Sequence, residues 1–122
     1  MITRRTPDHG APVEVHAVDG WVVVRVRGEV DLALEPALLA AHDQVVAYEE
    51  PHVYVDVTEV DFLDSSGVAA LAHLQRRARA REGYFVLSPA EPIVERVLDL
   101  TGLADAADDP DLVPLSLRDR RG

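Results

Sequence analysis

The sequence predicts a single α/β domain in which helices cover a mixed β-sheet. Its 122 residues suit one domain with a core of its own. A hairpin signal near the N-terminus joins two apolar stretches with strand character. Strand and helix patterns alternate after the hairpin and give the order β-β-α-β-α-β-α-β. Such an order is typical of a sheet covered by helices.

The N-terminal hairpin is predicted from Val13–Val18 and Trp21–Val26. The first stretch alternates between apolar and polar residues, as a half-exposed strand does. The dipeptide Asp19-Gly20 between the two stretches is a strong turn signal. The second stretch is almost continuously apolar, which places it nearer the centre of the sheet. It is predicted to end at Gly28, before an acidic exit loop over residues 29–31.

Hydrophobic spacing, together with proline and glycine signals, predicts the later elements. Pro36 suits the first turn of a helix, where its missing N–H costs nothing. Pro114 limits the last stretch to an edge strand. The third helix carries Ile93, Val97, Leu98 and Leu100 as its apolar positions. The predicted elements are helices over Leu32–Ala47, from Val68 to about Arg81 and from Pro92 to Leu100, and strands at His52–Thr58, Tyr84–Leu87 and Leu112–Leu117.

The domain is expected to span residues 13–117, with a loose N-terminal tail over 1–12 and a polar C-terminal tail over 118–122. No apolar run is long enough for a transmembrane helix, and the N-terminus lacks the apolar segment of a signal peptide. We therefore expect a soluble, cytoplasmic protein that does not contact a membrane.

The formal net charge of −10 argues against nucleic acid and anionic membranes as direct partners. A protein partner with basic or mixed charge fits better. No glycine-rich phosphate loop is present, so no nucleotide cofactor is expected. The histidines are not spaced as metal ligands on one helix, so they are expected to be isolated, and no metal site is predicted. The arginines between Arg76 and Arg81 are interpreted as a solvated last helical turn.

The stretch Val60–Val68 is predicted to connect a strand to a helix and contains Asp64-Ser65-Ser66-Gly67. The first amides of a helix lack internal partners, and the helix dipole there favours negative charge. Ser65 or Ser66 can therefore cap the helix, and Ser65 can also carry a phosphate. A phosphate would add about −1.5 to −2 charge units, which affects a docked partner more than the fold. The residues alone leave both interpretations open.

Carboxylates also gather around this stretch. If their strands are parallel neighbours, the acids lie at one edge of the sheet. There they form either a site for Mg²⁺ or acid–base chemistry, or a solvated rim with helix caps. These acids are Glu29, Asp31, Glu59, Asp61 and Asp64.

A catalytic serine is disfavoured at this strand-to-helix corner. The nucleophile elbow of hydrolases has glycine two residues before the serine, and Leu63 stands at that position before Ser65. Asp64 would also repel the oxyanion of a tetrahedral intermediate.

Four short motifs occur in order along the chain. They are Gly28–Leu32, Val53–Val57, Val60–Gly67, and Val94–Leu98 with Leu100–Leu103. With these motifs the chain resembles the STAS domains of bacterial anti-sigma factor antagonists over residues 12–104. The resemblance implies a STAS-like single domain with a mixed β-sheet and helices packed mainly on one side. Residues 111–122 match the C-terminal helix of the family poorly.

The resemblance implies a function in partner switching. The unphosphorylated antagonist binds an anti-sigma factor that is a serine kinase, and this frees a sigma factor. Phosphorylation by that kinase ends the binding, and a serine phosphatase restores it. The implied phosphorylation site is Ser65. The implied partner-binding residues are Asp31, Asp61, Asp64, Ser65, Ser66 and Gly67.

The protein is thus expected to be a phosphoprotein that regulates transcription, and not an enzyme with a cofactor of its own. Other STAS domains serve as transporter tails, sensor modules or lipid-handling subunits. The alternative is therefore a STAS scaffold or ligand-binding module without sigma-factor regulation.

Overall fold

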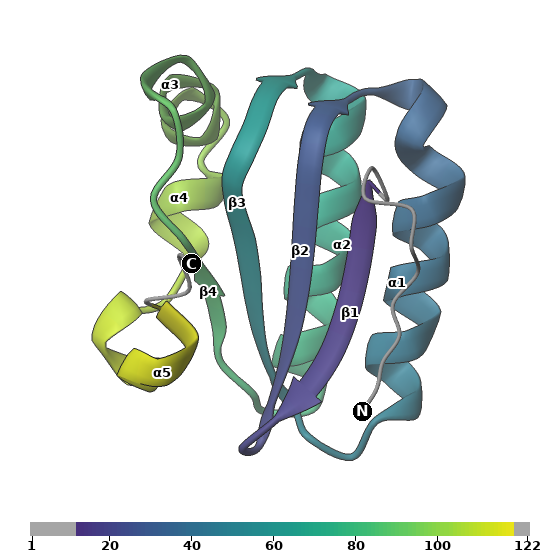
Figure 1. Ribbon diagram of the computed structural model, residues 1–122, viewed down its shortest axis with the longest axis vertical. Helices are drawn as coiled ribbons and strands as arrows, with labels where there is room; N and C mark the ends of the chain where they lie inside the picture. Colours follow the sequence, from purple (N-terminus) through teal and green to yellow (C-terminus); the bar gives the residue numbers. More distant parts are fainter. Residues whose placement is uncertain (1–11, 119–122) are drawn as a thin grey trace.

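The computed structural model describes residues 12–118 and shows a sheet with strand order β1-β2-β3-β4 (Figure 1). The strands are β1 (Val13–Val18), β2 (Trp21–Val30), β3 (His52–Leu63) and β4 (Phe85–Leu87). β1 is antiparallel to β2, whereas β2 is parallel to β3 and β3 to β4. The predicted mixed sheet is confirmed. Apart from Pro12 and Arg118, the predicted tails lie outside the described residues.

The hairpin turn is the predicted Asp19-Gly20. Val18 pairs with Trp21, so only these two residues connect the strands. Both have positive φ, 52° for Asp19 and 86° for Gly20. Two left-handed residues give a turn whose twist matches that of the strands, which explains why this dipeptide fixes the register.

Two long helices cover one face of the sheet (Figure 1). α1 (Glu35–Ala47) follows the 3-10 turn η1 (Leu32–Leu34), and Pro36 lies in its first turn as predicted. α2 (Ser65–Ala80) follows β3 directly. Within residues 12–118, no helix is long and apolar enough to cross a membrane.

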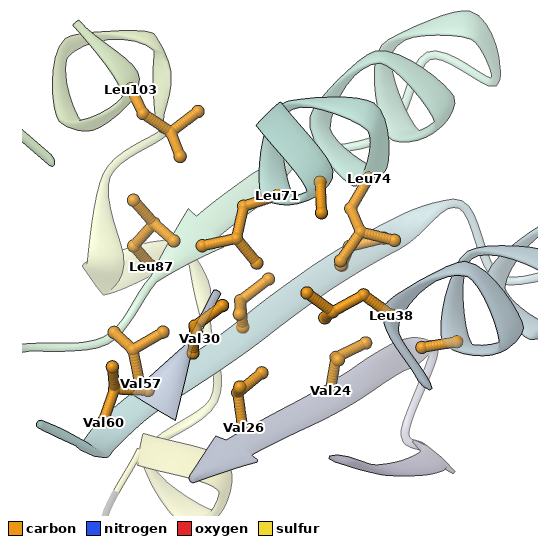
Figure 2. Close-up of a cluster of buried hydrophobic side chains, with 14 of the residues drawn as sticks. Val24, Val26, Val30, Leu38, Val57, Val60, Leu71, Leu74, Leu87 and Leu103 are labelled. Carbon is orange, nitrogen blue, oxygen red and sulfur yellow. The ribbon is translucent and has the colours of Figure 1, made fainter. Parts of the chain in front are cut away.

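The main core lies between the sheet and these two helices. Val24 and Val26 of β2, Leu38 of α1, and Leu71 and Leu74 of α2 are each at most 2% exposed. Figure 2 shows these side chains between the strands and the helices. Burial of each such side chain stabilises the fold by about 1.5–3 kcal/mol. The core therefore holds α1 and α2 firmly against the sheet.

β2 and β3 are longer than predicted. β2 continues to Val30 and β3 to Leu63, so most of the expected acidic loops belong to strands. The pairing of β2 with β3 shifts register between Arg25 and Arg27 and again after Gly28, where φ is +75°. Such irregularities interrupt the alternation of inward- and outward-facing residues along the strand. In the sequence, this interruption looks like the end of the strand.

Val113 and Leu117 near the end of the chain pack against the other face of the sheet, so the predicted edge strand at Leu112–Leu117 is wrong. Val94, Leu98 and Leu103 before them are buried in the main core. The chain forms α3 (Pro92–Leu100), the short α4 (Leu103–Ala106), η2 (Pro110–Leu112) and α5 (Leu115–Arg118). Pro114 has no N–H for a sheet ladder, and burial against the sheet takes precedence over pairing. The buried cluster on this face consists of Trp21, Val23, Tyr54, Val86, Val113 and Leu117.

Two arginines at the end of α2 donate hydrogen bonds to residues of neighbouring loops. The prediction that the last turn of this helix is solvated is therefore wrong for them. Arg79 Nη1 donates to Asp108 Oδ2 at 2.6 Å, and Arg81 Nη2 donates to the Tyr48 carbonyl at 2.6 Å. The Phe85 N–H also donates to Asp108, at 2.9 Å. Burial raises the pKa of Asp108, but the hydrogen bonds from Arg79 and Phe85 outweigh burial and the pKa lies below its ordinary value.

A hydrogen bond between two basic side chains joins α1 to α2. Arg77 Nε donates to His42 Nε2 at 2.8 Å, and the His73 ring centroid lies 5.8 Å from that of His42. The prediction of isolated histidines is wrong for this pair. Burial lowers the pKa of His42, and the charges of Arg77, His73 and Arg76 lower it further against the opposing effect of Asp43.

This arrangement predicts that the free energy of unfolding falls as the pH drops below about 6.5. The folded chain disfavours the proton on His42, so the unfolded chain binds it first. The stabilisation is complete above the unfolded pKa and is lost as the pH falls toward the lower folded pKa. Urea denaturation at a series of pH values measures it. His42→Gln keeps an acceptor for Arg77 without titrating and should flatten the profile. An equally steep loss in that variant would contradict this assignment.

Candidate functional site

Asp31 and Asp64 are the first residues after two neighbouring strands and lie next to each other at one edge of the sheet. Val30 ends β2 and Leu63 ends β3, and these two residues are partners in the parallel register. Neighbouring strands lie about 4.8 Å apart, so the residues that follow are also neighbours. The Asp64 N–H donates to the Val30 carbonyl at 3.3 Å and fixes this arrangement. Figure 1 shows this edge at the top, where α1 and α2 begin.

The N-cap of α2 is Asp64, so the interpretation of a serine as the cap is wrong. Asp64 is extended, with φ −112° and ψ −175°, and its Oδ1 accepts a hydrogen bond from the Gly67 N–H at 3.0 Å. A cap of this kind stabilises a helix by about 0.5–2 kcal/mol. The hydroxyls of Ser65 and Ser66 form no hydrogen bond within residues 12–118. Ser65 is exposed and Ser66 is half-buried.

Gly67 allows the first turn of α2 to lie against the ends of both strands. A Cβ at this position would be 2.5 Å from the Val30 carbonyl oxygen, 2.7 Å from Val30 Cγ1 and 2.8 Å from Leu63 Cδ1. Contacts this short do not occur in folded proteins, and the carbonyl oxygen is fixed by the strand. The glycine therefore sets where Ser65 stands relative to Asp31.

The acids of this region serve as caps or lie on the strands. Asp31 Oδ1 accepts a hydrogen bond from the Ala33 N–H at 3.0 Å and caps η1, as Asp64 caps α2. The interpretation of a rim with caps holds for these two residues. Glu29, Glu59 and Asp61 belong to strands and are exposed. No cluster of three or more histidine, aspartate or glutamate side chains in residues 12–118 has the arrangement to hold a metal ion.

The structure brings most of the predicted site residues together. Asp31 and Asp64–Gly67 form one continuous edge, which we call the Ser65 edge. Asp61 stands apart from it and lines a surface hollow of about 260 Å³ between β3 and α3. The residues around this hollow are Thr58, Glu59, Val60, Asp61, Glu91 and Ile93.

Three exposed apolar side chains around the carboxyl ends of the strands were not predicted. Leu32 is 64% exposed, Phe62 is 47% exposed and Ile93 is 66% exposed. The predicted apolar face of the third helix is also wrong in part, because Val94 and Leu98 are the residues that it buries. The predicted apolar residues and the buried residues of this helix both have helical spacing. Only the position of the sheet decides which of the two sets faces the core.

Comparisons with known proteins agree with this fold. The model of the STAS domain family matches residues 12–113. An anti-sigma-B factor antagonist from Listeria monocytogenes is 29% identical over 80 residues, which cover 66% of this chain and 70% of that protein. An anti-sigma factor antagonist from Mycobacterium paratuberculosis is 33% identical, with a TM-score of 0.71 over 88% of this chain and 93% of that chain.

The anti-sigma factor antagonist SpoIIAA has the same fold. Its unphosphorylated form has a TM-score of 0.71 at 24% identity, over 88% of this chain and 94% of that chain. The phosphorylated form of the Bacillus protein has a TM-score of 0.65 at 23% identity, over 88% and 97%. The family match extends over nearly all described residues and includes the whole Ser65 edge. The chain therefore belongs to the STAS domain family of bacterial anti-sigma factor antagonists.

Proposed function

We propose that this chain binds an anti-sigma serine kinase through the Ser65 edge and Asp61, and that phosphorylation of Ser65 by this kinase ends the binding. While bound, the kinase releases a sigma factor, and a serine phosphatase later removes the phosphate. The observation that supports this most is the exposed Ser65 hydroxyl. It makes no hydrogen bond within residues 12–118, and Asp64 supplies the helix cap in its place.

A phosphate on Ser65 would change the charge of this edge more than the fold. It adds about −1.5 to −2 charge units at pH 7. The dipole at the N-terminus of α2 stabilises this added negative charge by about 0.3–1 kcal/mol. The carboxylates of Asp31 and Asp64 repel it. In the free protein the exposed phosphate stays hydrated. A docked partner would have to remove that water beside two carboxylates, which is costly.

The comparisons support the same proposal. The relatives from Listeria and Mycobacterium carry the name anti-sigma factor antagonist or anti-sigma-B factor antagonist. SpoIIAA has been solved in both phosphorylated and unphosphorylated forms, so the STAS fold of that protein accommodates a phosphate.

Phosphate mapping tests the proposal. The purified chain is incubated with ATP and the anti-sigma serine kinase of the same genome, and its peptides are analysed by mass spectrometry. We expect one phosphate, on Ser65, because that hydroxyl is exposed and Ser66 is half-buried. Ser66→Ala is the matched control and should still be labelled, whereas Ser65→Ala should not. A folded wild-type chain that stays unlabelled, or carries its phosphate on Ser66, would contradict the proposal.

A further inference from the structure

The hollow between β3 and α3 is large enough to hold one side chain of a partner. Its volume of about 260 Å³ lies below the roughly 300–1,000 Å³ of typical small-molecule sites. Val60, which is 1% exposed, is buried beneath it, and Ile93 forms part of its wall. The hollow is open to solvent beside the end of β3, and Figure 1 shows α3 next to that end of the strand.

The carboxylates of the hollow are available to a cation. The side chains of Asp61 and Glu91 form no hydrogen bond or ion pair within residues 12–118. Glu59 forms an ion pair with Arg27, whose Nη1 lies 3.5 Å from Glu59 Oε1. Asp61 and Glu91 therefore offer unpaired negative charge to a basic side chain of a partner.

The wall of the hollow adds an apolar contact. Ile93 is 66% exposed, although its neighbour Val94 is 1% exposed and packs into the core. An aliphatic side chain beside unpaired carboxylates fits a partner segment with an apolar residue next to a basic one. A net charge of −10 also favours encounter with a basic surface.

The hollow lies within reach of a partner docked at the Ser65 edge. Asp61 and Asp64 are three residues apart in sequence at the extended end of β3, which corresponds to about 10 Å. A protein interface buries about 800 Å² on each partner, so one interface easily includes both features.

We propose that the hollow receives a segment of the anti-sigma serine kinase in which a lysine or arginine adjoins an apolar side chain. This inference rests on the proposed function, because the occupant is the partner that docks at the Ser65 edge. The basic side chain pairs with Asp61 and Glu91, and the apolar side chain covers Ile93. The hollow thus adds affinity and selects kinases that carry such a segment.

The test measures the affinity of the purified kinase for the unphosphorylated chain by calorimetry. Ile93→Ser removes the apolar contact and should raise Kd about tenfold, which corresponds to about 1.4 kcal/mol. Glu91→Gln removes one charge and should raise Kd about threefold and reduce the salt dependence of binding. In the kinase assay, both variants should raise KM without changing kcat, as expected for a docking contact.

Two residues on the same helix provide matched controls. Leu100 is 77% exposed and does not line the hollow, so Leu100→Ser should leave Kd within about twofold of wild type. Asp99 is exposed, and Asp99→Asn removes a carboxylate outside the hollow with the same expected result. Thermal unfolding of every variant confirms that the exposed substitutions leave the fold intact.

The outcomes separate this inference from the proposed function. Wild-type binding with an unchanged Kd for Ile93→Ser and Glu91→Gln would overturn the docking site and leave the proposed function standing. No complex between the kinase and the wild-type chain would overturn the proposed function and the docking site with it. Dimerisation of the chain that Ile93→Ser abolishes, with kinase binding unchanged, would assign the hollow to a second copy and overturn the docking site.

Discussion

Ser65→Asp is expected to weaken the complex with the anti-sigma serine kinase about 10- to 100-fold, whereas Ser65→Ala should retain it. The introduced carboxylate would stand beside Asp31 and Asp64, which both cap helical turns and cannot move away easily. A partner that docks there must desolvate three neighbouring negative charges, and like charges in an interface cost several kcal/mol. Alanine removes the hydroxyl without adding charge. Calorimetry with the unphosphorylated variants measures the difference.

A control separates this local effect from the change in net charge. Gln44→Glu adds the same single charge with almost the same shape at an exposed position on α1, far along the helix from the Ser65 edge. We expect its Kd to stay within about twofold of wild type, since exposed charges beyond about 8–10 Å are largely screened at physiological salt. Equal affinity of Ser65→Ala and Ser65→Asp for the kinase would contradict the proposed switch.

The folded state itself should tolerate Ser65→Asp. Ser65 is the first residue of α2, where an added carboxylate is favourable to the helix dipole by about 0.3–1 kcal/mol. Repulsion from Asp64 opposes this gain. The unfolding temperature is therefore expected to change little, and a loss of binding in a stable variant assigns the effect to the interface.

The alternation of strands and helices could be predicted because it depends on local patterns. The Asp19-Gly20 turn and Pro36 each carry a conformational preference that the fold uses. The length of β2 could not be predicted, since Gly28 and two register shifts break the period that marks a strand. The predicted edge strand in the final segment is wrong because the burial of this segment depends on a distant surface around Trp21 and Tyr54, which no local pattern reveals.

The placement of Asp31 and Asp64 at one edge of the sheet could be predicted, but the hydrogen bonds at that edge could not. Parallel neighbouring strands bring Asp31 and Asp64 to one edge, and this follows from the element order. Asp64, Ser65 and Ser66 are all good cap residues in consecutive positions, and a shift of one residue changes which one is the cap. The identity of the cap residue decides whether the Ser65 hydroxyl accepts a helix N–H or makes no hydrogen bond within residues 12–118.

Gly67→Ala is expected to lower the free energy of unfolding by about 2–4 kcal/mol. Helix propensity alone predicts the opposite sign, because alanine is better than glycine inside a helix by about 1 kcal/mol. The new Cβ would stand 2.5 Å from the Val30 carbonyl oxygen, so α2 must shift away from the end of β2. That shift strains the hydrogen bond from Asp64 to Val30 and the cap on Gly67.

Urea denaturation measures the change in the free energy of unfolding of Gly67→Ala. A gain in stability would mean that helix propensity dominates, and a loss would mean that the close contact with Val30 dominates. Ala69→Gly calibrates the propensity at an exposed position of the same helix and should cost about 1 kcal/mol. A Gly67→Ala variant as stable as wild type would show that α2 is not held against β2. If the loss occurs as expected, labelling of Ser65 by the kinase should also slow at temperatures where the variant is folded, because the shift moves Ser65 relative to Asp31. Stability and phosphorylation would then depend on the same close contact between a helix start and a strand end.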